Sequence, residues 1–200
     1  MIINGVIVLV TIVIFIIYGR NLKKNPLGTK KLVAIGMYSA IAFMLYLIHF
    51  ITYPQGGGIT LFSMLPIMLL SIFYGPTAGV TGGLIFGLLK VFNNPFIIHP
   101  VQFLLDYILS NMALGLVGIF GTNRRLNINI GAIFSVSLSV FIPILSGVVF
   151  FGQYAPSGMN VFLYSFIYNV SSAGVEGLLT IIVMNLLPIK KLKDMAVRGN

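Results

Sequence analysis

The stretch LPIMLLSIFYGPTAGVTGGLIFGLLK, residues 65–90, decides the fold class of this chain. It carries no charge before Lys90, and it is broken once, at Gly75-Pro76, because proline cannot continue a helix that precedes it. Each half is short for a helix that crosses a membrane. Small residues let a neighbouring helix approach closely, so the stretch predicts tightly packed helices within a membrane. Four glycines of the second half lie on or near one helical face: Gly79, Gly82, Gly83 and Gly87.

Apolar segments of this kind recur along the whole chain. Of its 200 residues, 58% are hydrophobic and only 8% are charged, whereas a soluble domain carries about 25% charged residues. The short alternating segments of a membrane β-barrel are absent. The composition therefore predicts an all-α integral membrane protein. Seven apolar segments are expected, at residues 2–18, 32–53, 60–74, 77–92, 101–120, 129–151 and 161–187.

The distribution of basic residues predicts how these segments cross the membrane. A basic loop at residues 20–31 separates the first two segments, and cytoplasmic loops carry an excess of Lys and Arg. With this loop in the cytoplasm, eleven of the twelve basic residues fall on that side, and only Lys90 lies near the outer end of its segment. We therefore expect a multi-pass protein of the cell membrane with its N-terminus outside and its C-terminus in the cytoplasm. The net charge of +9 then reflects topology, and no nucleic acid partner is expected.

The chain lacks the motifs of soluble enzymes. It has no Walker A sequence, no HExxH, no nucleophile elbow and no Cys/His cluster. The absence of cysteine excludes disulfides and cysteine metal sites. The only histidines, His49 and His99, both lie toward the outer face, which argues against an intramembrane hydrolase. We expect no enzymatic activity, no cofactor and no metal, so active transport would need a partner subunit or an ion gradient.

Polar side chains from distant segments share the outer leaflet in this topology. Gln102 and Asp106 lie in the first turns of segment 101–120, which enters the membrane from outside. Tyr164, Tyr168 and Asn169 lie in the outer third of the last segment. A carboxylate at membrane depth persists mainly where it has a partner, a water-filled cavity or a ligand. A mostly apolar site with a few converging polar groups is typical of small-molecule pockets. These residues therefore predict a ligand pocket near the outer face.

Each of these residues also has a structural interpretation. Asp106 could pair with Lys90 or cap the start of a helix. The tyrosines could belong to the interfacial belt of aromatic residues, and Asn169 could bridge two helices by a hydrogen bond. We interpret His99 as an outer-loop residue beside Pro100.

Glu176 is the second of two acidic residues inside apolar segments, and the third acid, Asp194, lies in the basic tail. It lies several turns from Asp106 in depth, so a catalytic pair of carboxylates is not expected. Three interpretations remain open: a hydrogen bond between helices in the neutral form, a proton site, or the floor of the pocket. We favour the first. The second would make the chain a stand-alone, proton-coupled secondary transporter of a small metabolite, with Glu176 as the coupling carboxylate.

Several stretches resemble one family of membrane proteins. Residues 65–79 resemble the second-to-third helix region of the substrate-binding S components of energy-coupling factor (ECF) vitamin transporters. QFLLDY at 102–107 is similar to the QAFLEY of the thiamine-specific ThiT/YuaJ family, FFGQYA at 150–155 to its FWSQYA, and YSFIYN at 164–169 to its YSLAVN. The similarity runs in consistent order from about Lys31 to Lys191. The resemblance implies the six-helix S-component core, and the first segment lies outside it.

The resemblance also implies the roles of particular residues. Asp106 would replace a glutamate that engages a cationic vitamin, and the pocket would lie near the outer membrane face. Aromatic faces would add cation–π attraction. Gln153 and Tyr154 would lie nearby in the same pocket. The expected ligand-binding residues are Asp106, Asn169, Tyr164, Tyr107, Phe151, Gln102, Phe96 and Tyr168.

This sequence departs from the family pattern at several pocket positions. It has no tryptophan: Phe151 stands at one tryptophan position of the family, and Gly57 at another in the outer loop. Pro143 and Asn94 fall where the family carries histidine, and Phe96 where it carries tyrosine. The expected ligand is therefore thiamine or a closely related cationic vitamin or precursor.

The resemblance finally implies an assembly. Gly36 and Ala40 would form the small-xxx-small motif that docks onto a transmembrane coupling subunit, and two ATPase subunits would complete an ATP-driven transporter. The S component of such a transporter is thought to topple in the membrane. The expected regions are an extra N-terminal transmembrane or peripheral helix at 1–19, the basic cytoplasmic loop at 20–31, a six-helix substrate-binding membrane domain at 32–190, and a basic cytoplasmic tail at 191–200.

Overall fold

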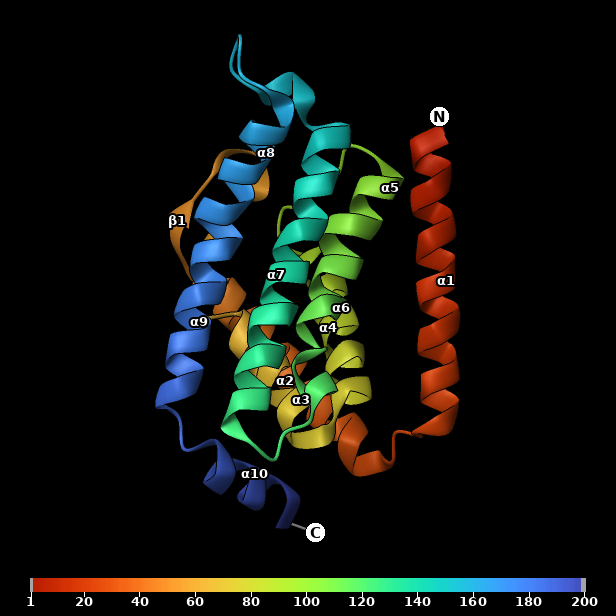
Figure 1. Ribbon diagram of the computed structural model, residues 1–200, viewed down its shortest axis with the longest axis vertical. Coiled ribbons are helices and arrows are strands. Elements are labelled where there is room, and N and C mark those ends of the chain that lie inside the picture. Colours follow the sequence, from red (N-terminus) through yellow and green to blue (C-terminus); the bar gives the residue numbers. More distant parts are fainter. Residues whose placement is uncertain (1, 199–200) are drawn as a thin grey trace.

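The computed structural model describes residues 2–198 and is mostly helical (Figure 1). The predicted fold class, a helical membrane protein, is confirmed. Apolar sequence with few helix breakers forms long rods, and each break coincides with Gly or Pro. The helices are α1 (Ile2–Lys24), α2 (Thr29–Tyr46), α3 (Met64–Tyr74), α4 (Pro76–Lys90), α5 (Pro100–Phe103), α6 (Ser110–Leu114), α7 (Arg125–Phe150), α8 (Val161–Asn169), α9 (Val175–Leu186) and α10 (Ile189–Arg198).

Some of these helices join into longer continuous rods. A π-helical turn, Leu104–Leu109, links α5 to α6, and a second one, Val170–Gly174, links α8 to α9. Within residues 2–198, four helices are long and apolar enough to cross a membrane: Ile3–Lys24, Pro100–Phe120, Arg125–Phe150 and Val161–Leu186. With α2, α3 and α4, six rods therefore follow α1, as expected for the S-component core.

One predicted apolar segment, 32–53, is helical only in part. Helix α2 ends at Tyr46, and an antiparallel hairpin of β1 (His49–Thr52) and β2 (Gly58–Thr60) follows it. Aromatic and β-branched residues favour extended backbone in β1. Gln55 and Gly56 reverse the chain with φ of 57° and 83°, in the left-handed region that glycine adopts most easily. The segment predicted at 60–74 is likewise helical only from Met64.

Helix α4 packs at the centre of the bundle against α2, α3 and α6. Glycine makes the contact with the α5–α6 rod possible: a Cβ atom at Gly87 would overlap the carbonyl oxygen of Tyr107, and one at Gly83 would overlap that of Asn111. The prediction that the glycines of this segment allow close packing is thus confirmed. The main buried core includes Ile67, Met68, Phe86, Leu114, Ala132 and Met184.

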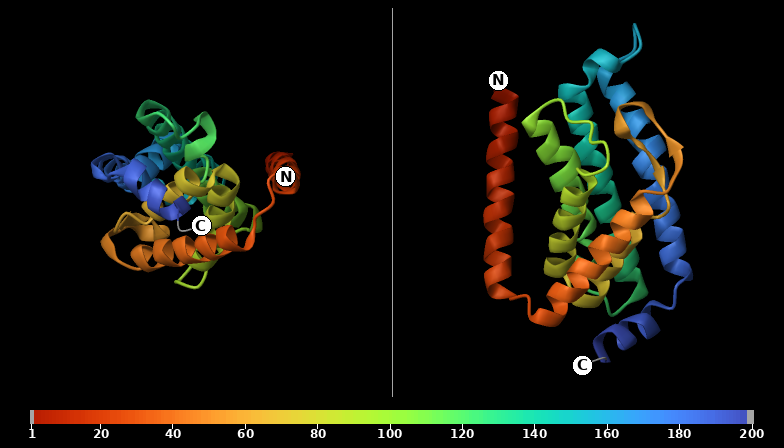
Figure 2. Two further views of the ribbon diagram at one scale, coloured as in Figure 1. Left: turned by 90° about the horizontal axis from the view of Figure 1, so that it is seen from below. Right: turned by 180° about the vertical axis from the view of Figure 1, so that it is seen from behind.

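The two ends of the molecule differ in charge. The end of α1, the start of α7 and helix α10 lie together at the lower end in Figure 1, and these are the segments that carry the basic clusters. The β-hairpin and the start of α8 lie toward the opposite end. The tail that sequence marks as basic forms α10, whose Ile189 and Leu192 pack against the core. Helix α1 lies at one edge of the bundle (Figure 2), where Ile7 and Tyr18 pack against the α5–α6 rod.

Candidate ligand pocket

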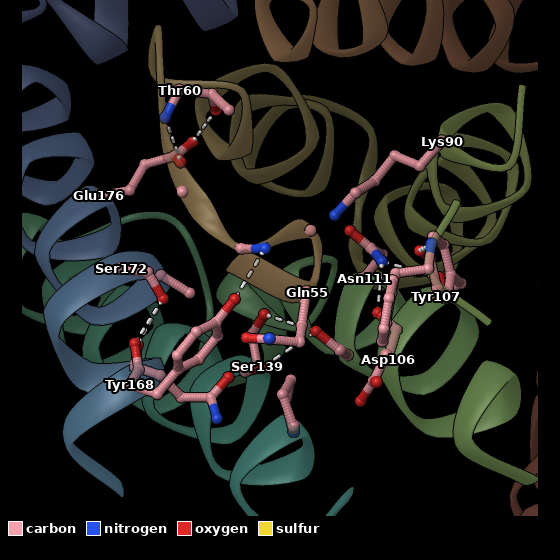
Figure 3. Close-up of a pocket in the computed structure, with 18 of the residues that line it drawn as sticks. Gln55, Thr60, Lys90, Asp106, Tyr107, Asn111, Ser139, Tyr168, Ser172 and Glu176 are labelled. Atoms are coloured by element: carbon pink, nitrogen blue, oxygen red, sulfur yellow. Dashed lines mark hydrogen bonds between the residues drawn. The ribbon is translucent and has the colours of Figure 1, made fainter. Parts of the chain in front are cut away.

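A cavity of about 170 Å³ lies between the hairpin loop, α4, α7 and the two rods that contain π-helical turns. Both π-helical turns border it, and such turns are frequent at functional sites because they redirect side chains. The structure brings all eight residues of the predicted ligand site to this one cavity (Figure 3). They are Phe96, Gln102, Asp106, Tyr107, Phe151, Tyr164, Tyr168 and Asn169.

Asp106 lies within the π-helical turn between α5 and α6. The Asn111 side chain donates to the backbone carbonyl of Tyr107 (2.7 Å) and, more weakly, to that of Asp106 (3.3 Å), which satisfies acceptors where the helical pattern is interrupted. Gln102 Nε2 donates to Asp106 Oδ2 at 2.6 Å, while Asp106 Oδ1 is buried and accepts no hydrogen bond within 3.5 Å from the described residues, with the Ser146 hydroxyl as a nearby donor. The carboxylate is therefore held in place with one oxygen unused.

Asp106 does not cap a helix, and its charge partner Lys90 faces it from another wall of the same cavity. Within residues 2–198 the two side chains form no ion pair within 4 Å. The start of α5 is capped instead by His99, whose Nδ1 accepts from the Val101 N–H at 3.1 Å. The His99 ring also stacks on Phe150, with centroids 4.9 Å apart. His99 is thus a structural residue of the loop, as interpreted from sequence.

Gln102 and Tyr107 together fix the loop that precedes α5. The Tyr107 hydroxyl accepts from the Phe96 N–H at 2.9 Å, and Gln102 Nε2 donates to the Phe96 carbonyl at 3.2 Å. The Phe96 ring lies 6.0 Å from that of Phe151, centroid to centroid. Tyr154 packs against both rings but does not line the cavity, and neither does Gln153, contrary to the expectation for this pair.

Tyr168 joins the hairpin loop to α8. Its hydroxyl accepts from the Gly57 N–H at 2.9 Å (Figure 3) and donates to the Pro54 carbonyl. A Cβ atom at Gly57 would lie 2.7 Å from Tyr168 Cζ, so the tyrosine ring occupies the space that any side chain at position 57 would need. Beside this ring, position 57 has room only for glycine. Tyr53 supports the arrangement, with its ring 5.7 Å from that of Tyr168.

Glu176 lies across the cavity from Asp106 (Figure 3). Its carboxylate accepts from the backbone N–H groups of Thr60 (2.9 Å) and Ser63 (3.0 Å) and lies within 2.8 Å of both of their hydroxyls. It therefore ties α9 to the end of β2 and the start of α3. The favoured interpretation, a hydrogen bond between helices, is too narrow, because half of these donors belong to the β2 strand.

Sequence reasoning did not assign several other residues of the cavity wall. Lys90 points into the cavity, with its Nζ 4.8 Å from the centroid of the Tyr46 ring and 5.4 Å from that of Phe86. The sequence pointed to Lys90 only through its position, because it is the one basic residue predicted to lie away from the cytoplasmic side. Asn111 follows Tyr107 by one turn and could have been found from that spacing. The remaining polar wall residues include Gln55, Thr60, Ser139 and Ser172.

The fold and the cavity define a class: a multi-pass helical membrane protein with a small-molecule pocket between its helices. The family model described as "Thiamine transporter protein (Thia_YuaJ)" matches residues 32–196. The chain therefore belongs to this family of thiamine transporters, and the resemblance read from the sequence is confirmed. Helix α1 lies outside the matched residues.

Individual relatives agree with this assignment. The thiamine transporter ThiT of Bacillus subtilis strain 168 is 36% identical over 172 residues, which cover 78% of this chain and 89% of the relative. The protein of the same name from Lacticaseibacillus paracasei is 28% identical over 176 residues, covering 79% and 88%. The solved structure of ThiT from Listeria monocytogenes has a TM-score of 0.73 at 24% identity and covers 83% of this chain and 96% of that one, which shows the shared fold.

Proposed function

We propose that the chain is the substrate-capture subunit of an ATP-driven ECF transporter and binds thiamine or a closely related cationic vitamin or precursor in the cavity around Asp106. Membership of the thiamine transporter family supports the substrate class. The observation that carries the proposal is the buried, unused Oδ1 of Asp106 in a cavity walled by aromatic rings. A carboxylate with a free oxygen at membrane depth is stabilised by a cation.

The other residues of the wall divide into two groups. Gln102 is fully engaged, because it donates to Asp106 and Phe96 and accepts from the Ile98 N–H at 3.3 Å, so its role is to position the carboxylate. Asn169 donates to the Ser165 carbonyl at 2.9 Å, which leaves its own carbonyl oxygen for a donor on the ligand. The aromatic faces would attract a positively charged ring. They belong to Phe96, Tyr107, Phe151, Tyr164 and Tyr168.

Delivery would require partner subunits. Gly36 and Ala40 are exposed on α2, and a Cβ atom at Gly36 would meet nothing within 4 Å. Such a surface suits close docking of a helix from a transmembrane coupling subunit, with two ATPase subunits beneath it. The gathering of basic segments at one end supports a cytoplasmic location for that end and for the C-terminus.

Calorimetry on the purified protein tests the substrate. Thiamine, its phosphates and its pyrimidine and thiazole precursors would be titrated separately, with a neutral vitamin of similar size as the control. We expect saturable heat with at least one cationic compound and none with the neutral one. No heat with any of these compounds would exclude the proposed ligand class.

Uptake into proteoliposomes tests the coupling. The proposal expects uptake only when a coupling subunit and two ATPases are present with ATP, and no effect of an uncoupler. Uptake by the chain alone that an uncoupler abolishes would instead support the proton-coupled alternative with Glu176.

A further inference from the structure

A second cavity, of about 570 Å³, lies between α1 and the rest of the bundle, and it shares no residue with the ligand pocket. On the α1 side its wall is a single helical stripe, because the residues recur at intervals of three or four. The opposite wall comes from α4, the α5–α6 rod and α7, through apolar residues such as Val80, Met112 and Ile142. The stripe consists of Ile14, Ile17, Tyr18, Asn21 and Asn25.

Helix α1 packs against the α5–α6 rod through Ile7 and Tyr18 but leaves a gap beside Ile14 and Ile17. A hydrogen bond of 2.8 Å between the Tyr18 hydroxyl and Thr81 Oγ1 joins it to α4. Ile14 and Ile17 face the bundle, yet 37% and 52% of their surfaces remain exposed. The cavity between α1 and the bundle is lined mostly by apolar side chains and opens to the surroundings of the protein. In a bilayer it is open to the hydrocarbon chains of lipids, which fill such gaps.

The cavity is polar at only one end. Asn21 and Asn25 lie at the end of α1, Lys31 lies at the start of α2, and Thr77 lies at the turn between α3 and α4. The segments that carry them, the end of α1, the start of α2 and the turn between α3 and α4, lie at the end of the molecule that also carries the basic clusters (Figure 1). Above them the wall is apolar. The lysine and the amides can bind a negatively charged headgroup, and the apolar wall beyond them can hold an acyl chain. This arrangement matches one phospholipid with a negatively charged headgroup.

We propose that this cavity is a binding site for a single anionic phospholipid, which joins α1 to the bundle. Lys31 and the two asparagines bind the phosphate, and an acyl chain lies between Ile17 and Met112. Basic residues near the cytoplasmic face attract anionic lipids by about 1 kcal/mol each, which corresponds to roughly a fivefold change in binding. The site is independent of the vitamin, because no residue of its wall borders the other cavity.

Native mass spectrometry of the full chain tests the charge requirement. The protein would be released from nanodiscs of phosphatidylcholine and phosphatidylglycerol in equal amounts, and retained lipid would be counted. We expect one retained phosphatidylglycerol, reduced about fivefold by Lys31→Gln. Lys23→Gln, on an exposed lysine of the same basic segment that does not line the cavity, is the matched control for general attraction and should reduce retention clearly less than Lys31→Gln does. Equal retention by the two variants would overturn the proposal.

A second pair of variants tests the location by shape alone. Ile16 and Ile17 are neighbours on α1 with exposed fractions of 51% and 52%, but only Ile17 lines the cavity. Ile17→Trp should displace the lipid, whereas Ile16→Trp should not. Displacement by both or by neither would place the lipid elsewhere, and a retained second copy of the chain in place of lipid would show that the groove is a protein interface. Thiamine calorimetry on Ile17→Trp should match the unmodified protein, so failure of this proposal and failure of the proposed function are distinguishable.

Discussion

Asp106 and Glu176 border the same cavity, but their hydrogen bonds differ. Asp106 is engaged through one oxygen and leaves the other unused, whereas Glu176 is surrounded by four donors from Thr60 and Ser63. An acceptor that is already satisfied gains little from a ligand, and removing it leaves buried donors without partners. We therefore propose that Asp106 binds the ligand, whereas Glu176 attaches α9 to β2 and α3.

Asp106→Asn tests the first assignment. The variant keeps the shape of the side chain but removes the charge, so the affinity for a cationic ligand should fall at least about thirtyfold, as for a lost buried charge pair. Calorimetry measures the dissociation constant. Asp194→Asn removes an acid from α10, outside the cavity, and should leave the affinity unchanged. An unaltered dissociation constant for Asp106→Asn would remove this residue from the site.

Glu176→Gln tests the second assignment. The substitution replaces one carboxylate oxygen with an NH₂ group, which faces the donors of Thr60 and Ser63 and cannot accept from them. The free energy of unfolding should therefore fall by about 1–3 kcal/mol. Thermal unfolding in detergent measures this loss. Gln153→Glu, on an exposed loop residue, is a control for the exchange itself. Unchanged stability together with lost proton-dependent uptake would favour the proton-site interpretation instead.

At the scale of elements, two close approaches shape the cavity. Helix α4 reaches the α5–α6 rod only because Gly83 and Gly87 lack a Cβ atom. The hairpin loop reaches α8 only because Gly57 also lacks a Cβ atom. The first contact sets the distance between Lys90 and the π-helical turn. The second places the hairpin loop over the opposite side of the cavity.

Gly87→Ala should therefore destabilise the bundle. The added methyl group overlaps the Tyr107 carbonyl, and overpacking of this kind costs about 1–3 kcal/mol. Gly19→Ala is the matched control, because Gly19 is also helical but nothing lies within 4 Å of its would-be Cβ atom. Its thermal midpoint should stay the same or rise, since alanine favours helix over glycine. Equal midpoints for both variants would contradict the close approach.

Tyr168→Phe should loosen the hairpin loop. It removes the hydroxyl that bonds to Gly57 and Pro54 while the ring still fills the space beside Gly57. The two lost hydrogen bonds contribute about 1 kcal/mol each, so a bound ligand should dissociate faster by up to about thirtyfold. Stopped-flow fluorescence or surface plasmon resonance measures the rate. An unchanged dissociation rate would show that this hydroxyl does not hold the loop over the ligand.

At the scale of the whole molecule, α1 is separable from the ligand pocket. The family match begins at residue 32, and no residue of α1 borders the cavity around Asp106. A chain that begins at residue 28 should therefore bind thiamine with the same affinity in calorimetry, while it retains less phosphatidylglycerol. Loss of ligand binding in a folded, truncated protein would mean that α1 supports the pocket.

Much of the site was predictable because its signals are local. The apolar runs, the Gly and Pro breaks and the motifs around Asp106 and Asn169 all lie within short stretches, and the eight residues they mark do share one cavity. The hairpin at His49–Thr60 was not predicted, because a short apolar run is compatible with helix or strand. The helical form of the basic tail depends on packing of Ile189 and Leu192 against the core.

The sequence by itself determined the membrane class, the order of the segments, the clustering of the basic residues and the family, because hydrophobicity, charge and motif similarity are properties of the chain. Only the tertiary structure decided that Lys90 and Glu176 face the same cavity as Asp106, and that Tyr168 fills the space beside Gly57. The physical reason is that the direction of a side chain depends on helix packing and on the two π-helical turns. Each added residue turns all later side chains by about 100° about the helix axis, which regular periodicity does not reveal.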